Sequence, residues 1–574
     1  MPIKILTTVL AYFCIASMAT TQASVKLPET IKVDPAALTS EPICDPKISA
    51  SWREAQVIEG VKIKESLRCS PDNPYLIAAA VKGTNNISMG TLMETALSPD
   101  TIIKTDDMDG DGDPDRIIIK LEVMELNGQS PDFEGLIPTF DIAPGVQPGA
   151  WVFAPKTRGM STENFESVRA HSLLRLPSPV IRVEQGDIVQ IVLENTHYLP
   201  HTIHLHGVDH QYTHAGGHVD GGDGVPQTSE MFLMPGESRT YEFQARQTGT
   251  MLYHCHVQTH THLAMGLVGM IIVEENRTNN WLQTLNVGAG NVRHPSVAIQ
   301  EEFDHEYDLH YHAMDKELTE IIQKYNDPRL VARDMNRLYD ITDSTEDYYM
   351  LNGLSFPYTL RESIVTVEAD QKIKLRVANT ASETLSMHTH GHKATITHYD
   401  GIEHNPIAQI QRDVYALSAA QRIDLTLNTT NDGLNSYGEG IWLFHDHREK
   451  GITTNGMSPG GNVSMIVYNS YLNEMGLPLA QGSDTSKYFT EEFHARTLPI
   501  WQDLDEVGSL GTPAGQSRLE SFNPEARTDM LNLFYGLLAG ILLYLFIAKR
   551  QQTLQAVSGM TANLKGSKGS ANNE

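Results

Sequence analysis

The sequence predicts an all-β protein with two similar sandwich domains, followed by a membrane segment. Short runs of alternating apolar and polar residues, separated by Gly, Pro and Asn, are typical of half-buried strands. These runs are IIIKLEVMEL, VIRVEQGDIVQIVLENT, RTYEFQARQ, IVTVEADQKIKLRVANT, QRIDLTLNTT and GNVSMIVY. They fall into two blocks, 117–276 and 345–470, with the same order of features: a run ending in Asn-Thr, two His-x-His motifs and a final β run. We interpret this order as an internal duplication of one sandwich.

The two ends of the 574-residue chain resemble export and membrane signals. Residues 1–23 carry one lysine, an apolar run and the small-residue end Thr-Gln-Ala, which predicts a secretory signal peptide. Residues 530–548 are uncharged and are followed by Lys549 and Arg550, which predicts a transmembrane helix with a cytoplasmic tail at 549–574. A short buried helix is the alternative interpretation of each segment. We therefore expect an exported body that a single C-terminal helix anchors at the periplasmic or extracellular face.

The remaining segments flank or join the two blocks. Residues 24–116 form an N-terminal extension of unknown role, and 471–529 read as a polar linker. Residues 277–344 read as a connector, with a helix-like stretch from Lys316 to Tyr339.

An acidic run near the end of the extension is a candidate calcium loop. Asp107, Asp109 and Asp111, with Gly112, match the first half of such a loop. The position expected to hold the closing glutamate is Ile118. A solvated acidic turn is an equally good interpretation.

Charge and cysteine content restrict the partners and the chemistry. The net charge of −28 excludes a nucleic-acid partner and favours attraction of cations. Of the four cysteines, Cys14 leaves with the signal peptide, and Cys44 and Cys69 are a candidate disulfide in an oxidising compartment. Cys255 has no partner, which suits a metal-bound thiolate.

Four His-x-His motifs carry the strongest chemical signal. Side chains alternate between the faces of a strand, so the two histidines of each motif point the same way. Four such pairs at matching places in two repeated sandwiches predict a shared metal cluster with eight imidazole ligands. The eight are His204, His206, His254, His256, His388, His390, His445 and His447.

A second metal site is predicted on the opposite face of the motif HCH, where Cys255 points. The odd offset between His201 and His204 places His201 on that face in a regular strand, and His260 and Met265 follow shortly after. One Cys, two His and a weak axial Met form the ligand set of a blue, electron-transfer copper. His262, between His260 and Met265, is a candidate residue at the substrate edge, and a rim residue without such a role is the alternative.

These motifs together resemble the multicopper oxidases, in particular their two-domain, laccase-like branch with the blue (type 1) copper in the first domain. The resemblance rests on HLHG, DGVPQT, PGES, YHCHxxxHxxxxM, HTHGH and FHDH, and covers about 117–470. It implies two Greek-key cupredoxin sandwiches and about four coppers per chain: one type 1, one type 2 and a type 3 pair. It also implies a homotrimer whose clusters close at subunit interfaces.

The resemblance assigns roles to individual residues. His204 and His388 would hold the type 2 copper and the other six cluster histidines the type 3 pair. Asp223, in DGVPQ, would serve proton transfer, although a turn Asp before Gly explains it equally well. In the second block, Asp446, Gly451, Gly456 and Leu385 replace the four blue-copper ligands, so Asp446 is expected to be structural.

The implied activity is one-electron oxidation of a small donor coupled to reduction of dioxygen to water. Metal ions, phenols and small nitrogen compounds remain open as donors. A copper nitrite reductase is one alternative, although it needs only one three-histidine copper beside the blue one. A non-catalytic copper-binding protein is another, and the histidines at 210, 214 and 218 would suit it.

Overall fold

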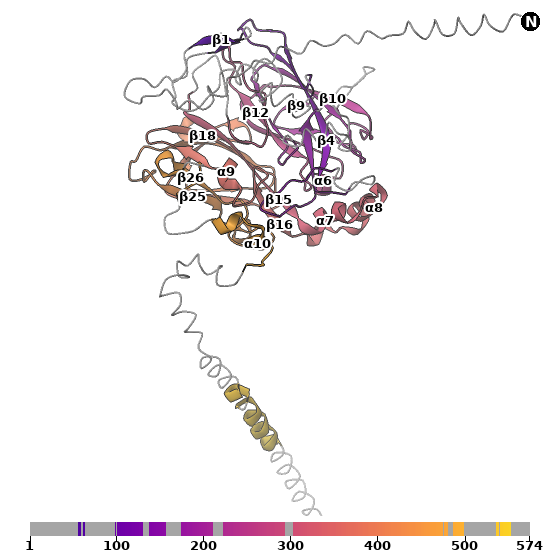
Figure 1. Ribbon diagram of the computed structural model, residues 1–574, viewed down its shortest axis with the longest axis vertical. Helices are drawn as coiled ribbons and strands as arrows, with labels where there is room; N and C mark the ends of the chain where they lie inside the picture. Colours follow the sequence, from indigo (N-terminus) through magenta and orange to yellow (C-terminus); the bar gives the residue numbers. More distant parts are fainter. Residues whose placement is uncertain are drawn as a thin grey trace, which may run out of the picture. The chain divides into compact units, whose positions relative to one another are not determined.

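The computed structural model describes residues 55–58, 61–63, 98, 100–129, 137–156, 174–210, 222–292, 302–473, 476–479, 486–498, 535–538 and 540–552. The chain divides into two compact units, Met1–Leu479 and Ala480–Glu574. The first unit contains all the strands (Figure 1). The predicted signal peptide, Cys44 and Cys69 lie outside the described residues.

The first sandwich consists of a six-stranded and a five-stranded sheet whose facing side chains form one core. The larger sheet contains β3 (Ile102–Thr105), β4 (Arg116–Leu126), β5 (Ala150–Pro155), β7 (Ile188–Glu194), β9 (Asp209–His210) and β10 (Ser238–Gln244). The smaller sheet contains β6 (Val180–Glu184), β8 (His204–His206), β11 (Gly249–His254), β12 (Val268–Glu274) and β13 (Leu285–Asn286). Its order is β13-β6-β12-β11-β8, so β8 forms an edge.

The second sandwich repeats this arrangement with an eight-stranded and a five-stranded sheet. The larger sheet contains β14 (Gly290–Asn291), β15 (His305–Asp315), β16 (Glu346–Leu351), β18 (Lys372–Asn379), β20 (Ala394–Tyr399), β21 (Ile402–Glu403), β22 (Ile410–Arg412) and β24 (Arg422–Asn428). The smaller sheet contains β17 (Val365–Val367), β19 (Leu385–Thr389), β23 (Val414–Leu417), β25 (Ile441–Asp446) and β26 (Ser464–Tyr468). The all-β prediction is confirmed.

The two sandwiches share local hydrogen bonds as well as strand order. The side-chain amide of Asn195 donates to the backbone oxygens of Leu199 (2.8 Å) and Leu233 (2.9 Å). In the second sandwich, Asn379 donates in the same way to Glu383 (2.9 Å) and Leu417 (3.0 Å). These contacts fix which positions of the two halves correspond.

The segment expected to be a connector contributes to the second sandwich. Its strand β15 pairs in parallel with β18, as β4 pairs with β7 in the first half. The predicted helical stretch forms α7 (Lys316–Lys324), α8 (Pro328–Arg333) and a π-turn η3 (Asp334–Leu338). The helix is interrupted because Asp327 caps α8 and Pro328 occupies its first turn.

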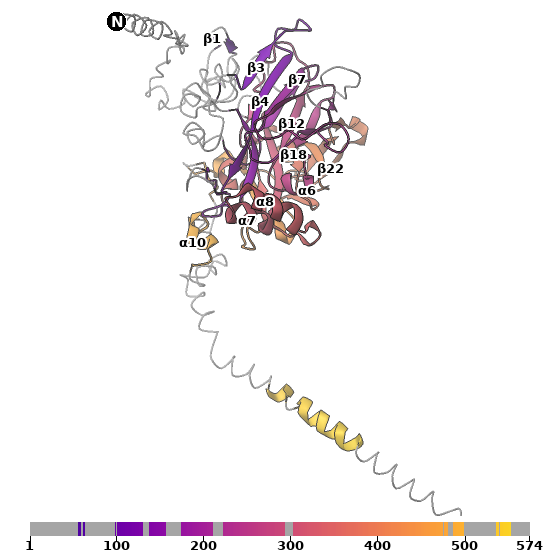
Figure 2. The same cartoon turned by 90° about the vertical axis from the view of Figure 1, so that its right-hand side faces the viewer.

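The remaining short elements lie in loops, at chain ends or outside the two sandwiches. They are β1 (Gln56–Ile58), β2 (Val61–Ile63), α6 (Thr259–His262), η4 (Ile341–Asp343), α9 (Thr359–Glu362), η5 (Pro406–Ala408), η6 (Glu449–Ile452), η7 (Asn469–Tyr471), η8 (Ser486–Phe489) and α10 (Glu491–His494). Figure 2 shows the strands of the first unit from the side.

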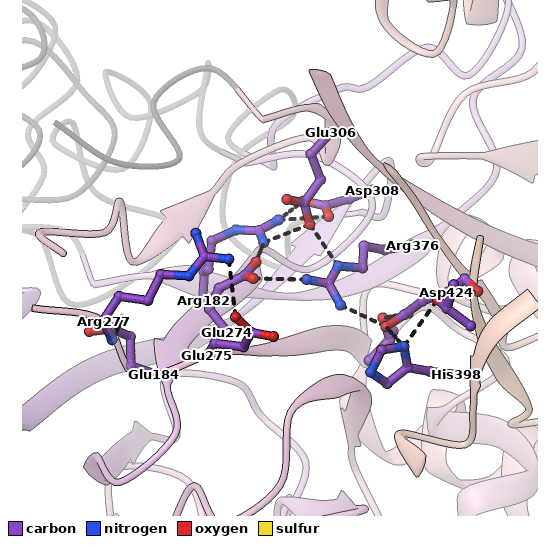
Figure 3. Close-up of polar contacts among 12 residues, drawn as sticks. Arg182, Glu184, Glu274, Glu275, Arg277, Glu306, Asp308, Arg376, His398 and Asp424 are labelled. Carbon is purple, nitrogen blue, oxygen red and sulfur yellow. Dashed lines mark hydrogen bonds and ion pairs between the residues drawn. The ribbon is translucent and has the colours of Figure 1, made fainter. Parts of the chain in front are cut away.

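Buried ion pairs join the two sandwiches (Figure 3). Arg182 on β6 contacts Asp308 on β15 at 2.8 Å, and Arg376 on β18 contacts Glu274 on β12 at 2.9 Å. Both guanidinium groups are only 1% exposed, and Arg376 also contacts Asp424 at 2.6 Å. Because buried charges are stable only when they are paired, this network requires the two sandwiches to stay in register.

In the second unit, residues 535–538 and 540–552 are helical. Among the described residues, no helix is both long and apolar enough to cross a membrane. The predicted anchor at 530–548 is therefore not confirmed.

Candidate metal centre

A buried sulfur and two buried imidazoles meet at the end of β11. Cys255 Sγ lies 3.6 Å from His201 Nδ1 and 3.4 Å from His262 Nδ1. His201 and Cys255 are fully buried and His262 is 2% exposed. His201 is held by a two-hydrogen-bond bridge to Leu233, and the backbone N–H of Cys255 donates to Leu267 at 3.0 Å. One donor atom from each of the three side chains lies within 4.8 Å of the others, which is close enough to hold one metal ion.

The assignment of His260 as a ligand is wrong, because His260 is exposed and His262 takes its place. The chain leaves the strand after Cys255, and Gln258 adopts a left-handed conformation (φ 44°) before the single turn of α6. That turn directs Thr261 and His262 inward. His262 is therefore not a rim residue. Met265 is fully buried in the core that contains Cys255, and its axial role stays a prediction.

Burial sets the protonation states at this site. It raises the pKa of the Cys255 thiol to about 12 and lowers the pKa of His262 to about 3. The pKa of His201 is also well below its ordinary value, because of burial and the neighbouring histidines. Neutral imidazoles are ready to bind a metal, and a cation would displace the thiol proton. One thiolate with two imidazoles is the donor set that copper prefers.

Four histidines of the first sandwich form a compact group, the first tetrad. Its members are His204, His206, His254 and His256, and neighbouring rings have centroids 5.0–5.6 Å apart. His204 on β8 pairs directly with His254 on β11. The Nε2 atoms of His206 and His254 lie 3.0 Å apart.

Backbone oxygens contact the Nδ1 atoms of two members of the first tetrad, His204 and His254. His204 Nδ1 contacts the oxygen of Asp223 at 2.5 Å, and His254 Nδ1 contacts that of Cys255 at 2.9 Å. An Nδ1 proton donated to a carbonyl leaves Nε2 as the metal-binding atom. His256 Nδ1 is buried and has no hydrogen-bond partner, so the hydrogen-bonding capacity of this nitrogen is unsatisfied. Two Nε2 atoms at 3.0 Å also suit two ligands that each lie about 2 Å from one ion.

The second sandwich reproduces this arrangement in the second tetrad, His388, His390, His445 and His447. Its ring centroids lie 4.8–5.9 Å apart. The Nε2 atoms of His390 and His445 lie 3.3 Å apart, and Nδ1 of His445 contacts the oxygen of Asp446 at 2.8 Å. Nδ1 of His388 contacts the oxygen of Asp413 at 2.8 Å, as His204 contacts Asp223. No sequence motif surrounds Asp413, so its contact with His388 is visible only in the fold.

Each tetrad supplies only half of the predicted eight ligands. The ring contacts and hydrogen bonds that define each tetrad join histidines of the same sandwich. The structure brings together the members of each tetrad.

The blue-copper position of the second sandwich is filled by a charged network. Asp446 is fully buried and accepts hydrogen bonds from the backbone N–H of Ser386 (3.0 Å) and from Arg448 Nε (2.8 Å). Arg448 also contacts Glu383 at 2.6 Å. The two carboxylates satisfy the guanidinium at the positions that match the Cys255 group of the first sandwich, which agrees with a structural role for Asp446.

The other sequence-predicted residues lie around these centres. Asp223 reaches the first tetrad through its backbone oxygen, while its carboxylate accepts a hydrogen bond from Ser229. The side chain of His210, and all of His214 and His218, lie outside the described residues.

The three carboxylates of the acidic run are close together. One oxygen from each of Asp107, Asp109 and Asp111 lies within 4.8 Å of the others. They also bind backbone N–H groups of their own loop, for example Gly110 at 2.7 Å from Asp107. The grouping agrees with the predicted calcium loop, but binding of calcium stays a prediction.

Two multicopper oxidase family models match the chain, one at residues 174–278 and one at 331–460. Laccase-3 of Botryotinia fuckeliana is 36% identical over 114 residues, 19% of this chain and 23% of that protein. The copper-containing nitrite reductase of Neisseria meningitidis is 33% identical over 102 residues, 17% of this chain and 23% of that protein. The match therefore spans less than a quarter of either relative. Among solved structures, the blue copper oxidase of Nitrosomonas europaea has a TM-score of 0.44 at 23% identity, with 67% of this chain and 95% of that chain covered.

Proposed function

Since this chain belongs to the multicopper oxidase family, we propose that it oxidises a small electron donor and transfers the electrons to dioxygen, forming water. The observation that carries the proposal is the position of Cys255. Its sulfur faces His201 and His262, while its neighbours in the chain, His254 and His256, belong to the first tetrad. Copper at these residues would supply one-electron redox chemistry at the sulfur and oxygen reduction at the histidines.

The residues around the metals have distinct tasks. Cys255 joins the electron-accepting site to the first tetrad through its own backbone. Backbone oxygens of Asp223 and Asp413 orient His204 and His388, the two residues that we assign to the type 2 copper. The other six cluster histidines would hold the type 3 pair, for a total of about four coppers per chain. Asp223, whose backbone oxygen contacts His204, is proposed to deliver protons through its carboxylate.

We propose a homotrimer in which the first tetrad of one subunit faces the second tetrad of the next. The support is that each tetrad groups only four of the eight predicted ligands. A cyclic assembly closes every such interface with one repeated contact. We also propose that the protein is exported and anchored by residues 530–548, as their apolar sequence suggests.

The main rival is a copper nitrite reductase, to which the match with the Neisseria protein points. A reductase of that kind needs one three-histidine copper beside the blue copper. Two tetrads with eight histidines exceed this requirement and favour the oxidase. A copper-binding protein without turnover is the other alternative. Copper storage, however, does not require a buried cysteine that is joined through the backbone to a histidine cluster.

Metal analysis and oxygen uptake test the proposal together. Purified, copper-loaded protein should contain about four coppers per chain and consume oxygen with at least one of three donors: a phenol, ferrous or cuprous ions, or a small nitrogen compound. Two coppers per chain with nitrite turnover would identify a reductase. A fully loaded protein that consumes no oxygen with any donor would contradict the oxidase.

A further inference from the structure

His201 has a second buried partner on the side away from the sulfur. Its Nδ1 faces Cys255, and its Nε2 lies 2.9 Å from Nδ1 of His197. The two rings are 5.0 Å apart, and His197 is 5% exposed. His197 was not among the predicted ligands, and it does not belong to either tetrad.

His197 is in turn backed by a buried carboxylate. Its Nε2 lies 3.6 Å from Oε2 of Glu125, which is 3% exposed. The same oxygen accepts hydrogen bonds from Trp151 Nε1 (2.9 Å) and from the Tyr198 hydroxyl (2.6 Å). Trp151 Nε1 can only donate, and the Tyr198 hydroxyl also donates in this arrangement, so Oε2 of Glu125 accepts from both. Glu125, His197 and His201, which we call the relay, therefore lie in series behind the metal site. The 2.9 Å contact between the two imidazoles is within hydrogen-bond distance, whereas the 3.6 Å contact with Glu125 is electrostatic only.

Trp151 connects the relay to the rest of the site. Its ring meets His197 at 4.9 Å and His262 at 5.1 Å, both edge to face. Its backbone N–H donates to the oxygen of Met265 at 2.8 Å. One residue thus holds Glu125, His197 and the loop that carries His262 in a fixed relation.

The second sandwich provides an internal control, because it lacks the blue-copper ligands. Corresponding positions follow from matching contacts: Thr196 Oγ1 donates to the oxygen of Val123, and Thr380 Oγ1 to that of Tyr311. Two residues further along each strand stand Glu125 and Ala313. Their paired neighbours on the next strand are Trp151 and Tyr349.

The same comparison places Ala381 at the position of His197. The backbone N–H of His197 donates to the side chain of Asn195, and that of Ala381 to the side chain of Asn379. Ala313, Tyr349 and Ala381 pack together as a small apolar cluster. The relay is thus present only in the half that has the sulfur ligand.

We propose that Glu125 and His197 are positioning residues that orient His201 and lower the reduction potential of copper bound at Cys255. When Nε2 of His201 donates its proton to Nδ1 of His197, Nδ1 of His201 carries no proton and faces the metal position beside Cys255. A carboxylate behind that acceptor makes the imidazole a stronger electron donor, which favours the oxidised ion. The inference rests on the proposed function in one respect, that copper binds at Cys255.

The first test is Glu125→Gln in the copper-loaded full chain. Glutamine keeps an acceptor for Trp151 and Tyr198 and removes only the charge. The reduction potential, followed by the blue absorption in a redox titration, should rise. A tenfold loss of preference for the oxidised ion corresponds to about 59 mV in a one-electron couple.

The second test is His197→Gln, with copper retention and the electron paramagnetic resonance spectrum as readouts. Copper affinity at the blue site should fall about 10–100-fold, and the copper hyperfine splitting should change. His312→Gln is the matched control, because His312 is also buried and contacts the same loop at the oxygen of Ala264 (3.4 Å) without touching a ligand. It should leave the potential and the spectrum unchanged.

The outcomes separate the relay from the proposed function. Variants with the wild-type potential and spectrum, in a protein that is blue, would overturn the relay alone. An equal shift in His312→Gln would do the same, because general packing would then explain it. A wild-type chain that binds copper without any blue band would overturn the relay and the proposed function together.

Discussion

Two histidines stand two positions apart after Cys255, and only the second faces its sulfur. His262 Nδ1 lies 3.4 Å from Sγ, whereas His260 is exposed on the outer side of the same helical turn. A blue copper requires its ligands to lie close enough to bind a single ion. The spacing from Cys255 in the sequence does not decide which of the two histidines contacts the sulfur.

We therefore expect His262→Ala and His260→Ala to behave differently. His262→Ala removes one of the strong ligands, so the blue absorption should disappear and turnover should stop. His260→Ala should keep the blue band and most of the activity, since it alters only an exposed side chain. Visible absorption and copper content of the two purified variants make the measurement, with Cys255→Ser as the reference for a lost blue site. A blue His262→Ala protein would show that another residue completes the site.

At the residue scale, a feature can be predicted from the sequence when it depends only on neighbouring residues of the chain. The parity of a His-x-His motif is a local property of a strand, so the members of both tetrads could be read from the sequence. That His262, and not His260, faces the sulfur depends on the left-handed conformation of Gln258, which no sequence motif indicates. Glu125 on β4 and His197 in the loop after β7 come from segments far apart in the chain, so only the fold reveals their contact.

At the scale of elements, the alternating runs predicted the strands β4, β6, β7, β10, β17, β18, β24 and β26. The run 180–196 forms β6 and β7, with the turn at Gln185–Asp187 between them. Strand β15 lies in the segment expected to be a connector, although its sequence, HEYDLHYHAMD, alternates between polar and apolar residues. Its polar positions Asp308, His310 and His312 are buried like the apolar ones, because they contact Arg182 and Thr380 in the fold.

The loop between β3 and β4 supports a test at the same scale. Burial and the like charges of Asp113 and Asp109 raise the pKa of Asp111 to about 6. A carboxyl whose pKa is raised by folding lowers stability above that pKa, and this cost disappears as the pH falls toward 3.8. Calcium bound by the three carboxylates would offset the cost and would compete with protons near pH 6.

We expect calcium to raise the Tm at pH 7.5 and to have little effect at pH 5. At a calcium concentration of about 100 times Kd, the gain in the free energy of unfolding is about 2.7 kcal/mol. Thermal unfolding with calcium or with a chelator, at both pH values, makes the comparison. Asp107→Asn with Asp109→Asn is the control that should abolish the difference. Identical curves with calcium and chelator at pH 7.5 would show that the loop is only a solvated acidic turn.

The whole molecule places the two tetrads on sandwiches that cannot easily move past each other. Arg182 and Arg376 are buried and paired with carboxylates from both sandwiches, so sliding would leave charges unpaired. Interdomain apolar contacts, such as Leu252 and Ala378, add to this constraint. A cluster that needs both tetrads is therefore more readily completed by another copy of the chain than by rearrangement within one copy.

Mixing two inactive chains tests that conclusion directly. One chain carries His204→Ala and His206→Ala, and the other carries His388→Ala and His390→Ala. Each alone should assemble without oxygen uptake, because every interface contains one damaged tetrad. In co-assembled oligomers, about a quarter of the interfaces should join the intact first tetrad of one chain to the intact second tetrad of the other. Oxygen uptake should return in proportion, and mixing the separately assembled proteins without subunit exchange is the control. If co-assembly restores no activity while copper-loaded wild type is active, the cluster must form within a single chain.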